Sequence, residues 1–180
     1  MRRSELVSLA LAFIIPLGCG GSDNSSSTVT DPSLSCTVAT NGTFKATMNG
    51  QAWSACGKVT VQVQSQVLGK DTLNTVSWAG TGFFPGNVAY AVVMSASRLG
   101  KFVAGAYPVG PTSPAGSNLV VGGSDNNGWG ANAISGSGTI TVTAYSANHI
   151  TGTFSFSAPR VTGTGAATLQ VTNGTFDLSY

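Results

Sequence analysis

The stretch FKATMNGQAWSA, residues 44–55, decides the fold. Apolar side chains alternate with small or polar ones on both sides of Asn49-Gly50. Asn-Gly is the strongest short hairpin signal, because both residues tolerate the positive φ angles of a type I′ turn. A two-residue turn pairs Met48 with Gln51 and Ala46 with Trp53, so pattern and turn agree on register. The apolar face of this predicted hairpin consists of Phe44, Ala46, Met48, Trp53 and Ala55.

The same alternation continues along the chain. Val59, Val61, Val63 and Val67 alternate with Thr60 and three glutamines, which is typical of a half-buried strand. Further strands are expected at residues 74–84, 88–97, 101–107, 118–122, 138–145 and 149–158. Their expected inward side chains include Trp78, Ile140, Val142, Ala144, Ile150, Phe154 and Phe156.

A second Asn-Gly pair, Asn173-Gly174, lies near the end of the chain. It predicts a hairpin between residues 167–172 and 175–180 that pairs Val171 with Phe176. A bulge within one long strand is the alternative interpretation.

These patterns define the fold class. No window has convincing helical periodicity, and the 24 glycines suit many turns. Short strands separated by turn signals predict an all-β domain. We expect an antiparallel β-sandwich or flattened meander barrel of roughly 8–10 strands, with no substantial helix after the leader.

The N-terminus has the pattern of a bacterial lipoprotein signal peptide. Two arginines precede a short apolar run over residues 6–15, and Pro16-Leu17-Gly18-Cys19 follows. The run is shorter than the ~20 residues that span a bilayer. We therefore expect cleavage after residue 18 and acylation of Cys19. Pro16 stands where such signals usually have Leu, so an ordinary signal peptide cut nearby is the alternative.

This N-terminus predicts where the protein is located. Residues 1–18 would be removed, residues 19–40 would form a lipidated flexible tether, and residues 41–180 would form one domain. Acyl chains contribute ~0.8 kcal/mol per buried CH₂, so two or three chains hold a protein at a membrane. Gly20 after the cysteine favours sorting of the protein to the outer membrane. The sequence does not indicate whether the domain would face the periplasm or the outside of the cell.

Charge and cysteine content limit the partners and cofactors. Charged residues make up 8% of the chain, against ~25% in ordinary domains, and Glu5 is the one glutamate. Such weak charge argues against a nucleic-acid partner. With Cys19 acylated, Cys36 and Cys56 are expected to form a disulfide outside the cytoplasm, two free thiols being the alternative. A single histidine leaves too few ligands for a Cys/His metal site, so we expect no metal and no cofactor.

Three motifs resemble an uncharacterised family of bacterial secreted lipoproteins, known as a domain of unknown function. They are Phe44-x-Ala46-x-x-Asn49-Gly50-x-x-Trp53, Gly152-Thr153-Phe154-x-Phe156 and Asn173-Gly174-x-Phe176-x-x-x-Tyr180. The resemblance covers residues 44–180. It implies an all-β lipoprotein domain and transfers no catalytic residue.

One segment is a possible ligand loop. Residues 122–138 form the longest irregular stretch and include Asp125, Asn126, Asn127 and Trp129. The three polar residues have oxygen atoms that suit Ca²⁺, and the indole could stack on a sugar ring. The alternative is a solvated loop whose Trp folds back onto the sheet.

The expected function is a lipid-anchored envelope domain that is not an enzyme and has a structural, adhesive or ligand-binding role. A module for carbohydrate or a small apolar ligand is one alternative. An envelope or extracellular hydrolase is the other, and it requires His149 or Asp125 in a cleft beside a second polar partner. The sequence contains no nucleophile motif around His149.

Overall fold

The computed structural model describes residues 39–84, 88–111, 113 and 116–180. Within them the chain forms ten strands and no helix. The strands are β1 (Gly42–Met48), β2 (Gln51–Leu68), β3 (Asp71–Phe83), β4 (Ala89–Leu99), β5 (Gly105–Val109), β6 (Asn118–Gly123), β7 (Gly128–Ala131), β8 (Ser137–Tyr145), β9 (His149–Thr162) and β10 (Thr168–Ser179). The all-β antiparallel prediction is therefore confirmed.

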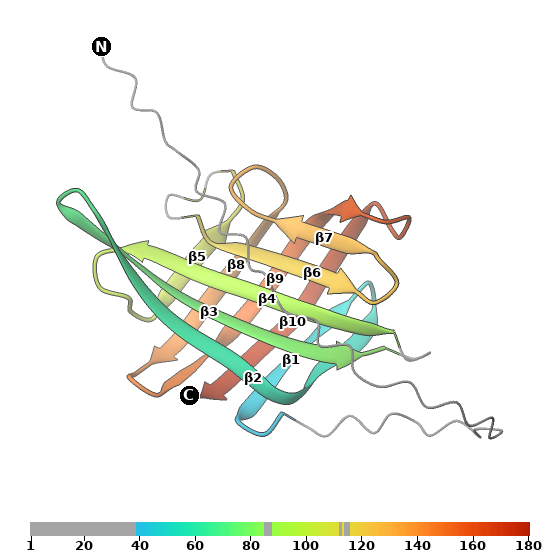
Figure 1. The fold of residues 1–180 in the computed structure, drawn as a ribbon, viewed down its shortest axis with the longest axis horizontal. Coiled ribbons are helices and arrows are strands. Elements are labelled where there is room, and N and C mark those ends of the chain that lie inside the picture. Colours follow the sequence, from blue (N-terminus) through green and yellow to red (C-terminus); the bar gives the residue numbers. More distant parts are fainter. Residues whose placement is uncertain (1–38, 85–87, 112, 114–115) are drawn as a thin grey trace, which may run out of the picture. The chain divides into compact units, whose positions relative to one another are not determined.

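The strands form two layers that share long strands. One layer runs β2-β3-β4-β6-β7, and the other runs β1-β10-β9-β8-β5. β2 crosses between the layers, since its start pairs with β1 and the rest pairs with β3. β9 pairs with β10 and β8 and then, near its end, with β7. Figure 1 shows the strands of the front layer crossing those behind. The pairing suits both a sandwich and a flattened barrel.

The first hairpin forms as the sequence predicts. Met48 pairs with Gln51 and Ala46 with Trp53, around a turn in which Asn49 and Gly50 have φ angles of 46° and 83°. All the expected inward side chains of this hairpin are buried. Phe44 meets the Trp53 indole edge-on at a centroid distance of 5.2 Å. The inward side chains of the hairpin therefore form one side of the hydrophobic core.

The remaining core lies between the two layers. Trp78 is 1% exposed and contacts Phe176 at a ring-centroid distance of 4.7 Å. Because the strands alternate, each layer supplies one apolar face to a single cluster. The layer of β8, β9 and β10 turns its other face to solvent.

The predicted second hairpin is wrong, and the bulge alternative is correct. β10 is one strand that pairs with β9 along both halves. Its register shifts between Val171 and Gly174, where Asn173 adopts a φ of 51°. The positive φ that suggested a turn instead absorbs one extra residue in a continuous ladder. Val171 and Phe176 still share the buried face, because the bulge restores the alternation.

Three smaller expectations also differ from the structure. The strand expected at 101–107 is β5, which begins at Gly105, and the predicted irregular stretch 122–138 contains β7. Ala144 is exposed because a register shift between Val142 and Ala144 turns it outward. Local composition does not reveal these shifts, since they depend on the neighbouring strands.

The leader, Cys19, Cys36 and most of the expected tether lie outside the described residues. Cys56 is disulfide-bonded, and Cys36 remains its predicted partner. In the described part of the chain, no helix is long and apolar enough to cross a membrane.

Candidate functional site

The predicted ligand loop is held by a hydrogen-bond network around Asp125. The Tyr90 hydroxyl donates to Asp125 Oδ2 at 2.9 Å, and the Asn127 side-chain amide donates to the same oxygen at 2.7 Å. The Asn127 backbone N–H donates to Asp125 Oδ1 at 3.1 Å. Asn127 Oδ1 in turn accepts from the Gly165 N–H at 2.6 Å. These bonds occupy both carboxylate oxygens and tie the loop to the β9–β10 connection.

The same network shifts two pKa values. Burial, and then the hydrogen bond to Asp125, raises the pKa of Tyr90 to about 12. The hydrogen bond from the Asn127 amide, helped by the bond from the Tyr90 hydroxyl, holds the pKa of Asp125 below its ordinary value, although burial acts in the opposite direction. The carboxylate thus stays ionised and the phenol neutral, and the hydrogen bonds between them fix the position of the loop.

Trp129 folds back onto the sheet, as the alternative interpretation has it. It is 4% exposed and stacks on Tyr90 at a centroid distance of 5.9 Å. Its Nε1 donates to the Ala166 carbonyl at 2.8 Å. Asn126 adopts a φ of 62° at the loop tip. The structure thus brings Asp125, Asn127 and Trp129 together as a packed support, with no indole face presented to a ligand.

His149, the candidate for hydrolase chemistry, pairs with Asp177. The His149 Nε2 to Asp177 Oδ1 distance is 2.7 Å, and the two side chains are 39% and 64% exposed. No hydroxyl or thiol among the described residues forms a hydrogen bond to the imidazole. The pair lies on the outer sheet face instead of in a cleft, and exposed pairs of this kind contribute ~0–1 kcal/mol. No group of three or more metal-ligating side chains occurs in the described part of the chain.

Serine and threonine side chains lie opposite one another on a different surface of the domain. We call the outward side of β8, β9 and β10 the Ser/Thr face. Thr153 lies opposite Thr141 on β8 and Thr175 on β10, and Thr139 lies opposite Ser155. The outward hydroxyl side chains of the face include Thr139, Thr141, Thr143, Thr151, Thr153, Ser155, Ser157 and Thr175, and the His149–Asp177 pair lies on the same side of β9 and β10. Antiparallel pairing places their hydroxyls in rows across neighbouring strands.

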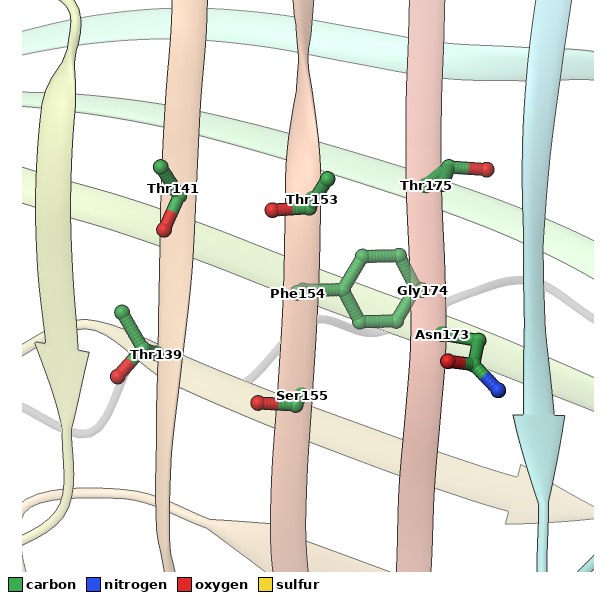
Figure 2. A pocket seen from close by; sticks show the side chains of 8 residues that line it. All are labelled: Thr139, Thr141, Thr153, Phe154, Ser155, Asn173, Gly174 and Thr175. Atoms are coloured by element: carbon green, nitrogen blue, oxygen red, sulfur yellow. The ribbon is translucent and has the colours of Figure 1, made fainter.

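A shallow hollow of about 460 Å³ lies on this face. Figure 2 shows Thr139 and Thr141 on β8, Thr153 and Ser155 on β9, and Asn173 and Thr175 on β10 around it. Phe154 and Gly174 complete its lining, and none of the lining residues is ionisable.

The β10 bulge helps to shape this hollow. It inserts an extra residue next to Gly174 and turns the Asn173 side chain to the outer face. Thr175 Oγ1 is buried and has no hydrogen-bond partner within the described residues. An orphaned hydroxyl of this kind is costly unless water or a ligand reaches it.

A second hollow of about 270 Å³ lies between β4 and β5. Ser97 and Ser117 line it, but the Ser117 hydroxyl already accepts from the Ser97 N–H at 3.1 Å. The Ser97 hydroxyl bonds to that of Thr75 at 3.0 Å. Ser113 also lines this hollow, and its buried hydroxyl has no hydrogen-bond partner within the described residues. The hollow on the Ser/Thr face is the larger of the two and presents more hydroxyl groups, so it is our candidate site.

Sequence reasoning did not identify the Ser/Thr face, although a signal was present. Thr139-x-Thr141-x-Thr143 and Thr151-x-Thr153-x-Ser155-x-Ser157 place hydroxyls at every second residue. That period marks the outer face of a strand. The contribution of β10 could not be foreseen while Asn173-Gly174 was expected to be a turn.

Comparison with known proteins found no match for the chain among protein-family models, curated proteins or solved structures.

Proposed function

We propose that the protein is a lipid-anchored, non-enzymatic domain of the bacterial cell envelope that binds neutral polysaccharide through the Ser/Thr face. The observation that carries the proposal is the hollow, whose lining contains five hydroxyls and one amide but no ionisable group. Hydroxyls both donate and accept, so they match the hydroxyls of an uncharged sugar chain. A charged polymer would find no counter-charge in the hollow.

The expected binding is weak for a single site. Each solvent-exposed hydroxyl of the lining exchanges a hydrogen bond to water for one to sugar, which is worth about 0.5–1.5 kcal/mol, whereas the buried Thr175 hydroxyl does not take part in this exchange. All three tryptophans are buried, and so is Phe154, the aromatic residue of the lining, so ring stacking adds nothing at the hollow. Many tethered copies on one membrane would bind a long polymer together, and avidity then compensates for the weak single site.

The anchoring part of the proposal rests on the leader pattern and on Cys19. Mass spectrometry of the protein from bacterial membranes should find an acylated N-terminal Cys19. Cys19→Ala should move the protein from the membrane to the soluble fraction. An unmodified N-terminus at another residue would contradict lipid anchoring but would leave the binding proposal open to its own test.

The binding part is tested by affinity electrophoresis in gels that contain dextran or laminarin, two neutral glucans, with dextran sulfate as the charged comparison. Thr141→Val combined with Thr153→Val removes two hydroxyls from the hollow at nearly constant shape. Thr60→Val and Thr81→Val are the controls, since both lie on exposed strand positions of the other layer. Retardation by the neutral glucans should fall with the first pair only. Equal retardation of all variants, or none for the unmodified protein, would overturn the proposal.

A further inference from the structure

One strand edge of the domain has no partner within the described residues. β3 pairs with β2 on one side from Ala55 to Leu68, whereas β1 pairs with β2 only from Gln51 to Ser54. At Val59 the Asn41 side chain bonds to both the backbone N–H and the carbonyl, at 2.9 and 2.8 Å. Beyond Val59, the outer edge of β2 as far as Leu68 pairs with nothing in the described chain. We call this segment, residues 60–68, the open β2 edge.

The open β2 edge lacks the features that usually prevent edge-to-edge pairing. Its sequence, TVQVQSQVL, contains no charge and no proline, two features that natural proteins use to protect edges. β5, the edge of the other layer, is only five residues long and contains Pro108. The open edge also exposes three apolar side chains, since Val63 is 48%, Val67 74% and Leu68 45% exposed.

The edge is also accessible. The pairing of β3 with β4 ends at Leu73 and Leu99, so the tip of the β2–β3 hairpin has no third strand. Figure 1 shows this hairpin extending past the end of β4. Along residues 60–66 β3 also pairs with β4, so an added strand would extend an existing sheet, and at Val67 and Leu68 it would be the third strand.

We propose that the open β2 edge pairs with the same edge of a second copy of this chain. An antiparallel pair centred on Ser65 places Val63 opposite Val67 and Gln64 opposite Gln66 of the other copy. Each pair occurs twice about the two-fold axis, as an isologous interface requires. The two exposed valines bury each other, and the glutamine side chains meet on the other face.

Charge placement supports a second copy as the occupant. Residues 60–68 contain no charged side chain, and Lys70 and Asp71 lie in and after the turn that ends β2, so neither extends the open edge. No like charges face each other, which would be destabilising in a cross-strand pair. The edge is therefore complementary to itself.

The oligomeric state tests this interface. The full-length protein, expressed with its own leader and purified in mild detergent, should sediment as a dimer that dissociates on dilution over about a hundredfold range. Val67→Lys should halve the mass at concentrations where the unmodified protein is dimeric. Val161→Lys is the matched control, because Val161 is a 68% exposed strand valine far along the chain on β9. It should leave the dimer intact.

Cross-linking and hydrogen exchange test the register and the occupant. Ser65→Cys should give a disulfide-linked dimer, because each Ser65 faces its copy across the axis, whereas Ser179→Cys should not. Amides of residues 62–68 should exchange faster in Val67→Lys. A monomer at all concentrations overturns the proposal, and protection of those amides in that monomer would show that the chain's own N-terminal segment covers the edge. A dimer that survives Val67→Lys overturns it as well.

Discussion

Gly174 lies directly opposite Phe154, and the phenyl ring occupies the space that a side chain at residue 174 would need. A Cβ at Gly174 would lie 2.5 Å from Phe154 Cδ2 and 2.5 Å from the Phe154 carbonyl oxygen. Because part of that contact is backbone, a rotamer change cannot relieve it. Gly174→Ala should therefore lower the free energy of unfolding by about 1–3 kcal/mol, as overpacking does. Urea denaturation measures this loss.

Gly122→Ala is the control for that substitution. Gly122 lies on β6, and a Cβ there would have no atom within 4 Å. Its stability should change by less than about 0.5 kcal/mol. If the two variants were equally stable, the close contact at the bulge would not be the reason for glycine at 174.

The contrast between the two Asn-Gly pairs shows what the sequence can predict. Around Asn49-Gly50 the strands are joined by the turn itself, so local pattern determined the register correctly. Around Asn173-Gly174 the same residues form a bulge, because β9 and β1 flank β10 along both halves and keep it extended. Both sites need a positive φ, and the outcome depends on distant strands that local pattern does not describe.

The candidate site was harder to predict than the fold. Asp125, Asn127 and Trp129 have the chemistry of a ligand loop, yet the structure uses them to hold Tyr90 and the β9–β10 connection. Their role depends on contacts between residues 35, 37 or 38 positions apart, which composition cannot reveal. The hydroxyls of the Ser/Thr face could be predicted within each strand, because they occur at every second residue. Their alignment across three strands could not be predicted, because it depends on the register between strands.

Asn41 should contribute strongly to stability although it precedes the first strand. Its side chain donates to the carbonyls of Val59 and Ser179, at 2.8 and 2.9 Å, and accepts from the Val59 N–H. Asn41→Ala leaves these backbone groups without partners and should cost about 1–3 kcal/mol in chemical denaturation. Asn148→Ala is the control, since the side chain of Asn148 accepts one 3.2 Å bond from Ser146. Equal losses in the two variants would argue against this role of Asn41.

Tyr90 should make the domain sensitive to alkali. Its pKa is raised in the folded state from 10.0 to about 12, first by burial and then by the bond to Asp125. The neutral phenol therefore stabilises the fold fully below pH 10, and this contribution is lost as the pH rises towards 12. Tyr90→Phe cannot ionise, so its unfolding free energy should fall less over that range than that of the unmodified protein.

Urea denaturation at several pH values between about 9 and 11.5 measures this difference. Tyr180→Phe should flatten the alkaline profile in the same way, because burial and then Tyr145 raise the pKa of Tyr180 to about 12. The double variant should have the flattest alkaline profile. Parallel profiles for all four proteins would show that neither tyrosine governs the alkaline loss of stability.

Cys36 should be the disulfide partner of Cys56, and the stability of cysteine variants tests this pairing. If Cys36 and Cys56 are joined, the bond closes a loop that contains the first hairpin, and such a loop contributes about 3 kcal/mol by limiting the unfolded chain. Cys36→Ser, Cys56→Ser and the double variant should then lose the same stability, because each removes one bond. Cys19→Ser should lose none, although it should release the protein from the membrane. A Cys36→Ser variant as stable as the unmodified protein would assign the bond to Cys19 and so contradict acylation at that residue.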